Sequence, residues 1–167
     1  QLQGEVEARP RSDGGLQVLI SVALSISTQH VLLVAAGAHT FGVPSHFVER
    51  LARFRISEVK TVEGREVVLL DNRPLPLVRL HDLLGLSDAA PDPVTDEQHP
   101  TLAAAILTSG EQRAAVRVDQ LVDQREMVVK DPGLPPAKTG YTAGAIPLDD
   151  GRVALMLNVP ALFERLP

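Results

Sequence analysis

The sequence contains no cysteine and no tryptophan, and aromatic residues make up only 3% of its 167 positions. The absence of cysteine excludes disulfide bonds and thiolate metal sites, and it fits a reducing compartment. With so few aromatic rings, the core has to be built from Val, Leu, Ile and Ala, and Val-rich apolar runs favour strands. The composition therefore predicts a mainly β protein with an aliphatic core.

The chain also lacks an excess of basic charge and a long apolar run. Its net charge is −5 with a pI near 5.5, which argues against a nucleic-acid partner because such proteins usually present a basic face. No apolar run approaches the roughly 18 residues of a membrane-spanning helix, and no signal peptide is recognisable. The chain opens on Gln1 rather than Met, which suggests a piece of a longer protein.

Motifs of catalysis are missing as well: the sequence has no Gly-rich phosphate loop, no nucleophile elbow and no closely spaced histidine pair. An enzyme would have to be a hydrolase or metal enzyme that uses Asp149, Asp150 and a histidine. However, Asp-Asp-Gly between two strands is typical of a hairpin turn, and we interpret Asp119 and Asp123 as a cap and a surface group. We expect no catalytic, cofactor or metal site, and solvated surface positions for the five histidines, His30, His39, His46, His81 and His99.

Two stretches of the chain, 29–86 and 101–163, follow the same plan of strands, turn and short helix. The copies share a turn glycine, two apolar positions and a hairpin turn, which match Gly37 to Gly110, Val43 to Val116, Val48 to Leu121 and 71–73 to 149–152. One repeat at this spacing predicts two related subdomains rather than a solenoid, whose units run to roughly 20–50 residues. The acidic, Pro-rich stretch 87–100 separates them as a loop.

The first half predicts a hairpin over 4–24 and strands at 31–36, 41–43, 58–62 and 66–70, the last leading into a tight turn at 71–72. The spacing of Phe47, Val48, Leu51 and Phe54 predicts an amphipathic helix that begins at Ser45, with an ion pair between Glu49 and Arg53 on its wet side. Pro74 and Pro76 predict an edge-like segment with partial pairing. A short helix with Leu80, Leu83 and Leu84 should end at Gly85.

The second half predicts strands near 101–108, 113–118, 126–130, 142–148 and 152–157, and a closing helical turn over 159–165. The stretch 131–138 is expected to be a loop. The apolar run 153–157 predicts a strand that is buried on both faces.

Five segments match a known family in order and spacing: GVPSHFVERLARF, EVKTVEGREVVLL, RPLPLVRLHDLLGL, AAVRVDQLVDQREMVVK and AGAIPLDDGRVALMLNVPAL. Over residues 29–167 the chain resembles the CheW-like regulatory domain, which ends the chemotaxis histidine kinase CheA and constitutes the coupling protein CheW. The last two segments are more similar to the kinase's domain, and the 4–24 hairpin resembles the last strands of its ATP-binding domain. The chain departs from the family at Ile146-Pro147-Leu148 and at Asn158, and Pro147 predicts an edge or bulged strand there.

The resemblance implies two intertwined five-stranded SH3-like barrels with short helices over 29–167, preceded by a hairpin and junction of the ATP-binding domain at 1–28. It implies a non-catalytic adaptor in a cytoplasmic, receptor-associated array at the inner membrane, with ATP and Mg bound elsewhere in the parent kinase. The expected partners are a CheW-type coupling protein, chemoreceptor tips and a second copy of the domain. A stand-alone coupling protein is the alternative.

By the same resemblance, the groove between the barrels and the exposed barrel ends should carry binding. The candidate partner-binding residues are Val43, Phe47, Val59, Gly64, Arg65, Leu75, Arg125, Met127, Val128 and Val129.

Overall fold

The computed structural model describes residues 4–10, 14–22, 27–86, 101–129 and 140–166. Strands dominate these ranges, and the helices are short, as the composition predicts. The predicted loops at 87–100 and 131–138 lie outside the described residues, as does His99.

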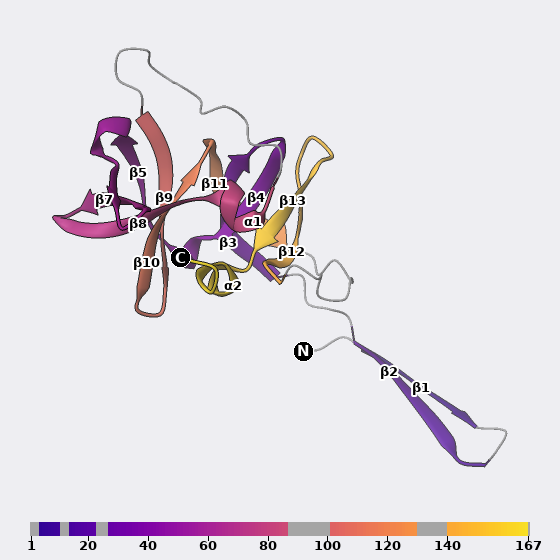
Figure 1. Cartoon of the computed structure of the whole chain (residues 1–167). Coiled ribbons are helices and arrows are strands. Elements are labelled where there is room, and N and C mark those ends of the chain that lie inside the picture. Colours follow the sequence, from indigo (N-terminus) through magenta and orange to yellow (C-terminus); the bar gives the residue numbers. More distant parts are fainter. Residues whose placement is uncertain (1–3, 11–13, 23–26, 87–100, 130–139, 167) are drawn as a thin grey trace.

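Two sheets form the body of the molecule (Figure 1). The five-stranded sheet has the order β11 (Gln120–Val129), β3 (Ser27–Ala36), β4 (His39–Pro44), β13 (Val153–Leu157) and β12 (Thr142–Pro147). The six-stranded sheet has the order β5 (Val48–Arg55), β9 (Thr101–Ser109), β10 (Gln112–Val118), β8 (Arg73–Arg79), β7 (Arg65–Leu70) and β6 (Lys60–Val62).

Each sheet contains strands from both halves of the sequence. The chain crosses to the six-stranded sheet after β4 and returns after β10, so that β5 pairs with β9 and β11 pairs with β3. Both crossing strands carry a register shift at matching places, Val48/Arg50 in β5 and Leu121/Asp123 in β11. The predicted five-stranded closed barrels are not confirmed, because the pairing among described strands gives two open orders of five and six strands.

Three aliphatic clusters fill the interior. The central cluster, between the sheets, includes residues of α1 (Leu80–Leu84) and α2 (Val159–Phe163). The other two lie within the six-stranded and the five-stranded sheet respectively. Strand β9 is buried on both faces, since Leu107 joins the central cluster and Ile106 the cluster of its own sheet.

The predicted turns are confirmed. Asp71 and Asn72 have φ of 51° and 62°, the left-handed pair that a two-residue hairpin turn requires. Gly37 and Gly110, matched by the sequence repeat, both have φ of 60°. Gly85 ends α1 with φ of 64°, as a C-terminal glycine should.

The helix predicted to begin at Ser45 is wrong. Only η1 (Ser45–Phe47) is helical, as a 3-10 turn, and β5 follows at once. The spacing of these apolar residues fits a helical period, but β5 pairs with β9 along its length, and this pairing makes the segment a strand. Leu51 is consequently 42% exposed, and Glu49 pairs with Arg113 across the sheet, at 2.6 and 2.8 Å, rather than with Arg53.

The prediction of a strand at 153–157 buried on both faces is also wrong. Ala154 and Met156 are buried, whereas Val153 is 60% and Leu155 42% exposed, because alternate side chains of a strand face opposite ways. The interpretation of Pro147 is confirmed, since β12 is an end strand with a register shift.

Strand β8 confirms the partial pairing expected around its prolines, although it does not lie at an edge. Its residues 73–76 pair with β7, and its residues 77–79 pair with β10 in parallel. The predicted N-terminal hairpin is also present as β1 (Gly4–Pro10) and β2 (Leu16–Val22), which pair with each other in antiparallel register.

A candidate partner-binding groove between the sheets

The structure distributes the ten predicted binding residues over several places. Val43, Leu75 and Met127 are only 2%, 5% and 8% exposed and serve the three core clusters, so their side chains are not presented to a partner. The exposed candidates are Gly64 and Arg65 at the β6–β7 turn and Arg125 on β11, whereas Phe47, Val59, Val128 and Val129 are half-buried.

The structure brings these candidates together only in pairs. Val59 packs against the cluster of Leu75, and Val129 against that of Met127. The alternation along β11 places Met127 and Val129 in the core, which confirms that the three apolar residues 127–129 cannot all point inward.

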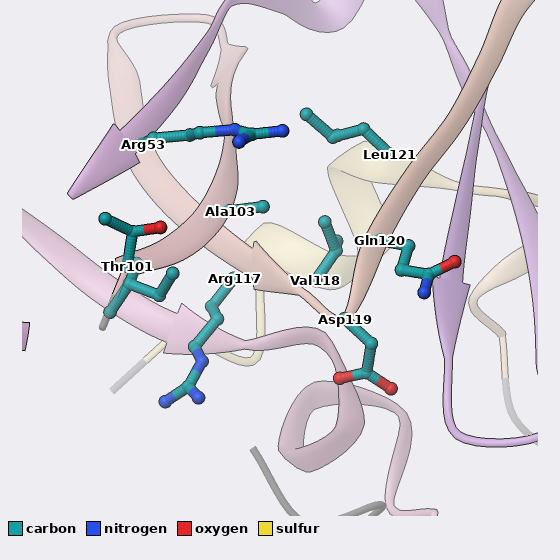
Figure 2. A pocket seen from close by; sticks show the side chains of 9 residues that line it. Arg53, Thr101, Ala103, Arg117, Val118, Asp119, Gln120 and Leu121 are labelled. Atoms are coloured by element: carbon teal, nitrogen blue, oxygen red, sulfur yellow. The ribbon is translucent and has the colours of Figure 1, made fainter. Parts of the chain in front are cut away.

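A groove lies where the two sheets meet, and none of the ten candidates lines it. Its volume is about 160 Å³, and its lining comes from β5, β9, the end of β10 and the start of β11: Arg53, Thr101, Leu102, Ala103, Arg117, Val118, Asp119, Gln120 and Leu121. In Figure 2, Arg53 and Leu121 extend toward each other over Ala103, whereas Arg117 and Asp119 point to another side. We call this site the intersheet groove.

The crossing of the chain from β10 to β11 forms one side of the groove. The Asp119 backbone N–H donates to the Ala35 carbonyl oxygen at 3.0 Å, and the Asp119 Oδ2 accepts from the Gly37 N–H at 2.7 Å. These bonds tie the crossing point to the β3–β4 turn. Asp119 lies between two strands and caps no helix. Ala103 supplies the room, because it stands opposite Arg53 in the β5–β9 register.

The groove has a mixed lining of aliphatic side chains, two arginines and polar groups that include Asp119. Ala103, Val118 and Leu121 offer aliphatic surface, and Arg53 projects over it from an exposed position on β5. Such a site suits an apolar side chain whose neighbour carries a carboxylate, because the guanidinium can hold both oxygens.

Outside the groove, an arginine of each crossing strand holds the turn of a hairpin from the same half. Arg50 of β5 pairs with Asp71 of the β7–β8 turn, and Arg125 of β11 pairs with Asp149 of the β12–β13 turn at 2.7 Å. The hydrogen bond that Arg125 donates to Asp149 raises the pKa of Arg125. Both ion pairs are solvent-exposed, so they contribute little stability individually.

The possible acid–base pair Asp149-Asp150 forms a turn, as interpreted from the sequence. Gly151 has φ of 81°, and Asp150 accepts from the Arg152 backbone N–H at 2.9 Å and from its Nε at 2.7 Å. The hydrogen bond from the Arg152 backbone N–H lowers the pKa of Asp150 most, and the bond from the Arg152 side chain lowers it further. Within the described ranges, no group of three His, Cys, Asp or Glu residues could hold a metal ion.

The expectation of solvated histidines holds for three of those described and fails for one. His30, His39 and His46 are exposed, but His81 is 7% exposed within α1. A five-residue helix held between two sheets buries four of its five residues, which leaves His81 no exposed face.

Sequence reasoning missed Arg53, Ala103 and Leu121 as groove residues. Arg53 was assigned to the wet side of a helix, and Ala103 has no chemical signature. The repeat was the signal that could have found them. It matches Val48 to Leu121, and the strands at these two positions, β5 and β11, each pair with a strand of the other half.

Comparisons with known proteins agree on one family. A family model described as the CheW-like domain matches residues 30–166. The gliding motility regulatory protein of Myxococcus xanthus is 32% identical over 99% of this chain, and the sensor histidine kinase CheAY of Helicobacter pylori is 28% identical over 98%. The chain spans about a fifth of the length of these curated relatives, 20% in both cases.

A solved structure supports the same fold. The scaffolding protein TtCheW of Thermoanaerobacter tengcongensis matches with a TM-score of 0.61 at 16% identity, over 83% of this chain and 94% of that protein. Both α-helices of the described chain are five residues long, and no helix there is long and apolar enough to cross a membrane.

Proposed function

Because the chain belongs to the CheW-like domain family, as the resemblance of its motifs indicated, we propose that it is a non-catalytic docking domain of a chemotaxis-type sensor kinase. In this function the domain binds a CheW-type coupling protein and chemoreceptor tips in a cytoplasmic array, and its occupancy controls phosphorylation elsewhere in the parent protein. Relatives named as CheA proteins and as a sensor histidine kinase align with nearly the whole chain, which supports this choice.

The intersheet groove is the observation that carries the proposal. It combines an aliphatic floor with the guanidinium of Arg53 at a junction that both halves of the chain build. A rigid concave site of this kind favours a protein segment that inserts an apolar side chain and places a carboxylate at the rim. Receptor tips and coupling proteins are the partners that the family relationship suggests for it.

Substitution of Arg53 tests the proposal directly. Arg53→Glu changes an exposed side chain and should leave the fold intact, so calorimetric titration with the CheW-type protein and with a receptor-tip fragment of the same organism reports on binding alone. We expect at least a tenfold loss of affinity for one of the two partners, because a charge at the rim turns from attractive to repulsive.

A matched control makes the same charge change away from the groove. Arg73 is exposed at the start of β8 and does not line the groove, so Arg73→Glu should bind like the unaltered protein. Equal affinities of the Arg53→Glu variant and the unaltered chain for both partners would exclude the groove. The absence of any binding by the unaltered chain would refute the proposed function as a whole.

A further inference from the structure

Two side chains of the second half of the chain close the C-terminal turn of α1. The last four carbonyl groups of an α-helix have no partner inside the helix, and in α1 these belong to residues 81–84. Two of them accept from backbone N–H groups of the turn that follows. The Arg165 Nη1 atom donates to the Leu83 carbonyl oxygen at 3.1 Å. The Tyr141 hydroxyl donates to the Leu84 carbonyl oxygen at 3.1 Å, so the second half completes a helix of the first.

The side chains of Tyr141 and Arg165, which we call the α1 clamp, also hold each other. The Arg165 Cζ atom lies 5.1 Å from the centroid of the Tyr141 ring, close enough for a cation–π interaction. The Tyr141 carbonyl oxygen accepts from the Asn158 N–H at 2.8 Å, and the Asn158 side chain caps α2 by accepting from the Ala161 N–H at 3.3 Å. The α1 clamp is therefore one unit that is fixed to α2.

Helix α1 depends on such support from outside. It has only five residues, whereas isolated helices shorter than about 12–15 residues are marginal in water. Its N-cap residue, Arg79, makes no side-chain capping bond. Two features therefore hold α1 in place: the burial of Leu80, Leu83 and Leu84 in the central cluster, and the α1 clamp at its other end.

One buried group of α1 opposes this docking. His81 is 7% exposed, and its Nε2 atom has no hydrogen-bond partner among the described residues. A buried polar atom without a partner costs free energy, which is recovered when the group returns to water. The leucines of α1 thus stabilise its docked position, whereas His81 favours its release.

The position of α1 in the body (Figure 1) connects the α1 clamp to the intersheet groove. Arg79, the residue before α1, stands opposite Arg117 at the end of β10, and Arg117 lines the groove. At its other end, α1 meets Tyr141 and Arg165. Because only the five residues of α1 separate these two places, a movement of α1 changes both.

We propose that the α1 clamp is a conformational latch: when it opens, α1 leaves the central cluster while both sheets stay folded. The closed state keeps the leucines buried and the clamp bonds formed, and the open state hydrates His81. This inference goes beyond the proposed docking function and does not require the groove to bind any partner. It gives the domain two states that differ beside the groove, and a ligand that binds one of them better shifts the balance.

Native-state amide exchange of the 167-residue chain, followed by NMR, tests the latch without a partner. The Gly85 and Leu86 N–H groups donate to carbonyl oxygens of α1 at 3.2 and 3.1 Å, so these two reporters exchange when α1 opens. The buried amides of β3 report on global unfolding. In the unaltered chain, we expect the reporters to exchange at least about tenfold faster than β3 and with little dependence on urea, because a local opening exposes little surface.

Three variants should move the latch in opposite directions. Arg165→Ala and Tyr141→Phe each remove one clamp bond, so each should speed exchange of the reporters about three- to tenfold. His81→Leu replaces the unpartnered imidazole by an apolar side chain, so it should slow the reporters at least about threefold. Fraying of the last turn alone would not respond to His81→Leu, since His81 stays buried in a frayed helix. His81→Met takes the place of His81→Leu if circular dichroism shows that the latter does not fold.

A matched control perturbs the sheets and not the latch. Ile106 is buried in the cluster of the six-stranded sheet, which contains no residue of α1, so Ile106→Val should speed exchange of β3 about two- to tenfold and leave the reporters unchanged. Equal acceleration of the reporters and β3 would show that α1 opens only with the whole fold, and would overturn the proposal. Reporters that ignore both clamp variants, or that do not slow when His81 is replaced, would overturn it as well. No partner is present in these measurements, so their outcome is separate from that of the groove titrations.

Discussion

Gly42 lies where the five-stranded sheet has no room for a side chain. It is buried in β4, beside Met156 of β13 in the parallel pairing. A Cβ at this position would overlap the Ile146 Cδ1 atom and lie 2.9 Å from the Val31 Cγ1 atom. The Gly42→Ala variant must therefore displace core side chains of two neighbouring strands, Ile146 of β12 and Val31 of β3.

The magnitude follows from two opposing effects. Overpacking of a core costs about 1–3 kcal/mol, and replacing a strand glycine by alanine returns about 0.5–1 kcal/mol of backbone entropy. We expect a net destabilisation of about 1–2 kcal/mol. Ile146→Val, which deletes the obstructing methyl group, should cost about 0.5–1.5 kcal/mol alone because it leaves a small void.

The double variant identifies the cause. With Gly42→Ala and Ile146→Val together, the new methyl group occupies space that the deleted one vacates, so the loss should be smaller than the sum of the single losses by about 1 kcal/mol. Urea unfolding of the four proteins, with unchanged slopes, measures this coupling. Additivity within about 0.5 kcal/mol would refute the reasoning that Ile146 sets the packing limit at Gly42.

Three other expectations concern the ends of elements and the turns. Gly85→Ala should cost about 1 kcal/mol in urea unfolding, because a left-handed residue ends α1 and the new methyl group meets no atom within 4 Å. Arg125→Ala should cost little in urea unfolding, and the loss should vanish in high salt as the pair with Asp149 is screened. The pKa of Asp150 is lowered in the folded state by its hydrogen bonds to Arg152. Its contribution is therefore present above the unfolded pKa of Asp and lost as pH falls through the lower folded value, and the difference in melting temperature between Asp150→Asn and the unaltered chain should shrink in acid.

The sequence predicted those features that one residue type enforces locally. The hairpin turn at 71–72 and the end of α1 at Gly85 require left-handed backbone, which Asn, Asp and Gly tolerate better than other residues. Pro147 lacks the backbone N–H that a central strand needs. These signals need no knowledge of the rest of the chain. The strands predicted at 66–70 and 113–118 were correct for a similar reason, since their alternation and bounding turns are local.

The failures occurred where the partner strand decides. The spacing of Val48, Leu51 and Phe54 predicts a helix. The segment is a strand only because it pairs with β9, which comes from the other half of the chain. A groove was expected, but its lining residues were missed for the same reason, because Arg53 and Leu121 are brought together by strand exchange. Seven of the ten binding candidates are apolar, and apolar character in this fold marks the core, as at Val43 and Leu75, as readily as a surface.

The duplication explains why one fold can present surfaces that are not equivalent. In both crossing strands the register shift is followed, three residues after its last residue, by a matching position. This position is Arg53 opposite Ala103 in β5, and Glu126 opposite His30 in β11. The backbone position is the same, but one half offers a cation over a small residue, and the other a carboxylate beside an imidazole. Because strands of each half complete the sheet of the other, neither sheet can form without both halves, and the spacing between the two surfaces is fixed by one shared core. A duplicated frame with diverged side chains can therefore present two different surfaces at fixed spacing.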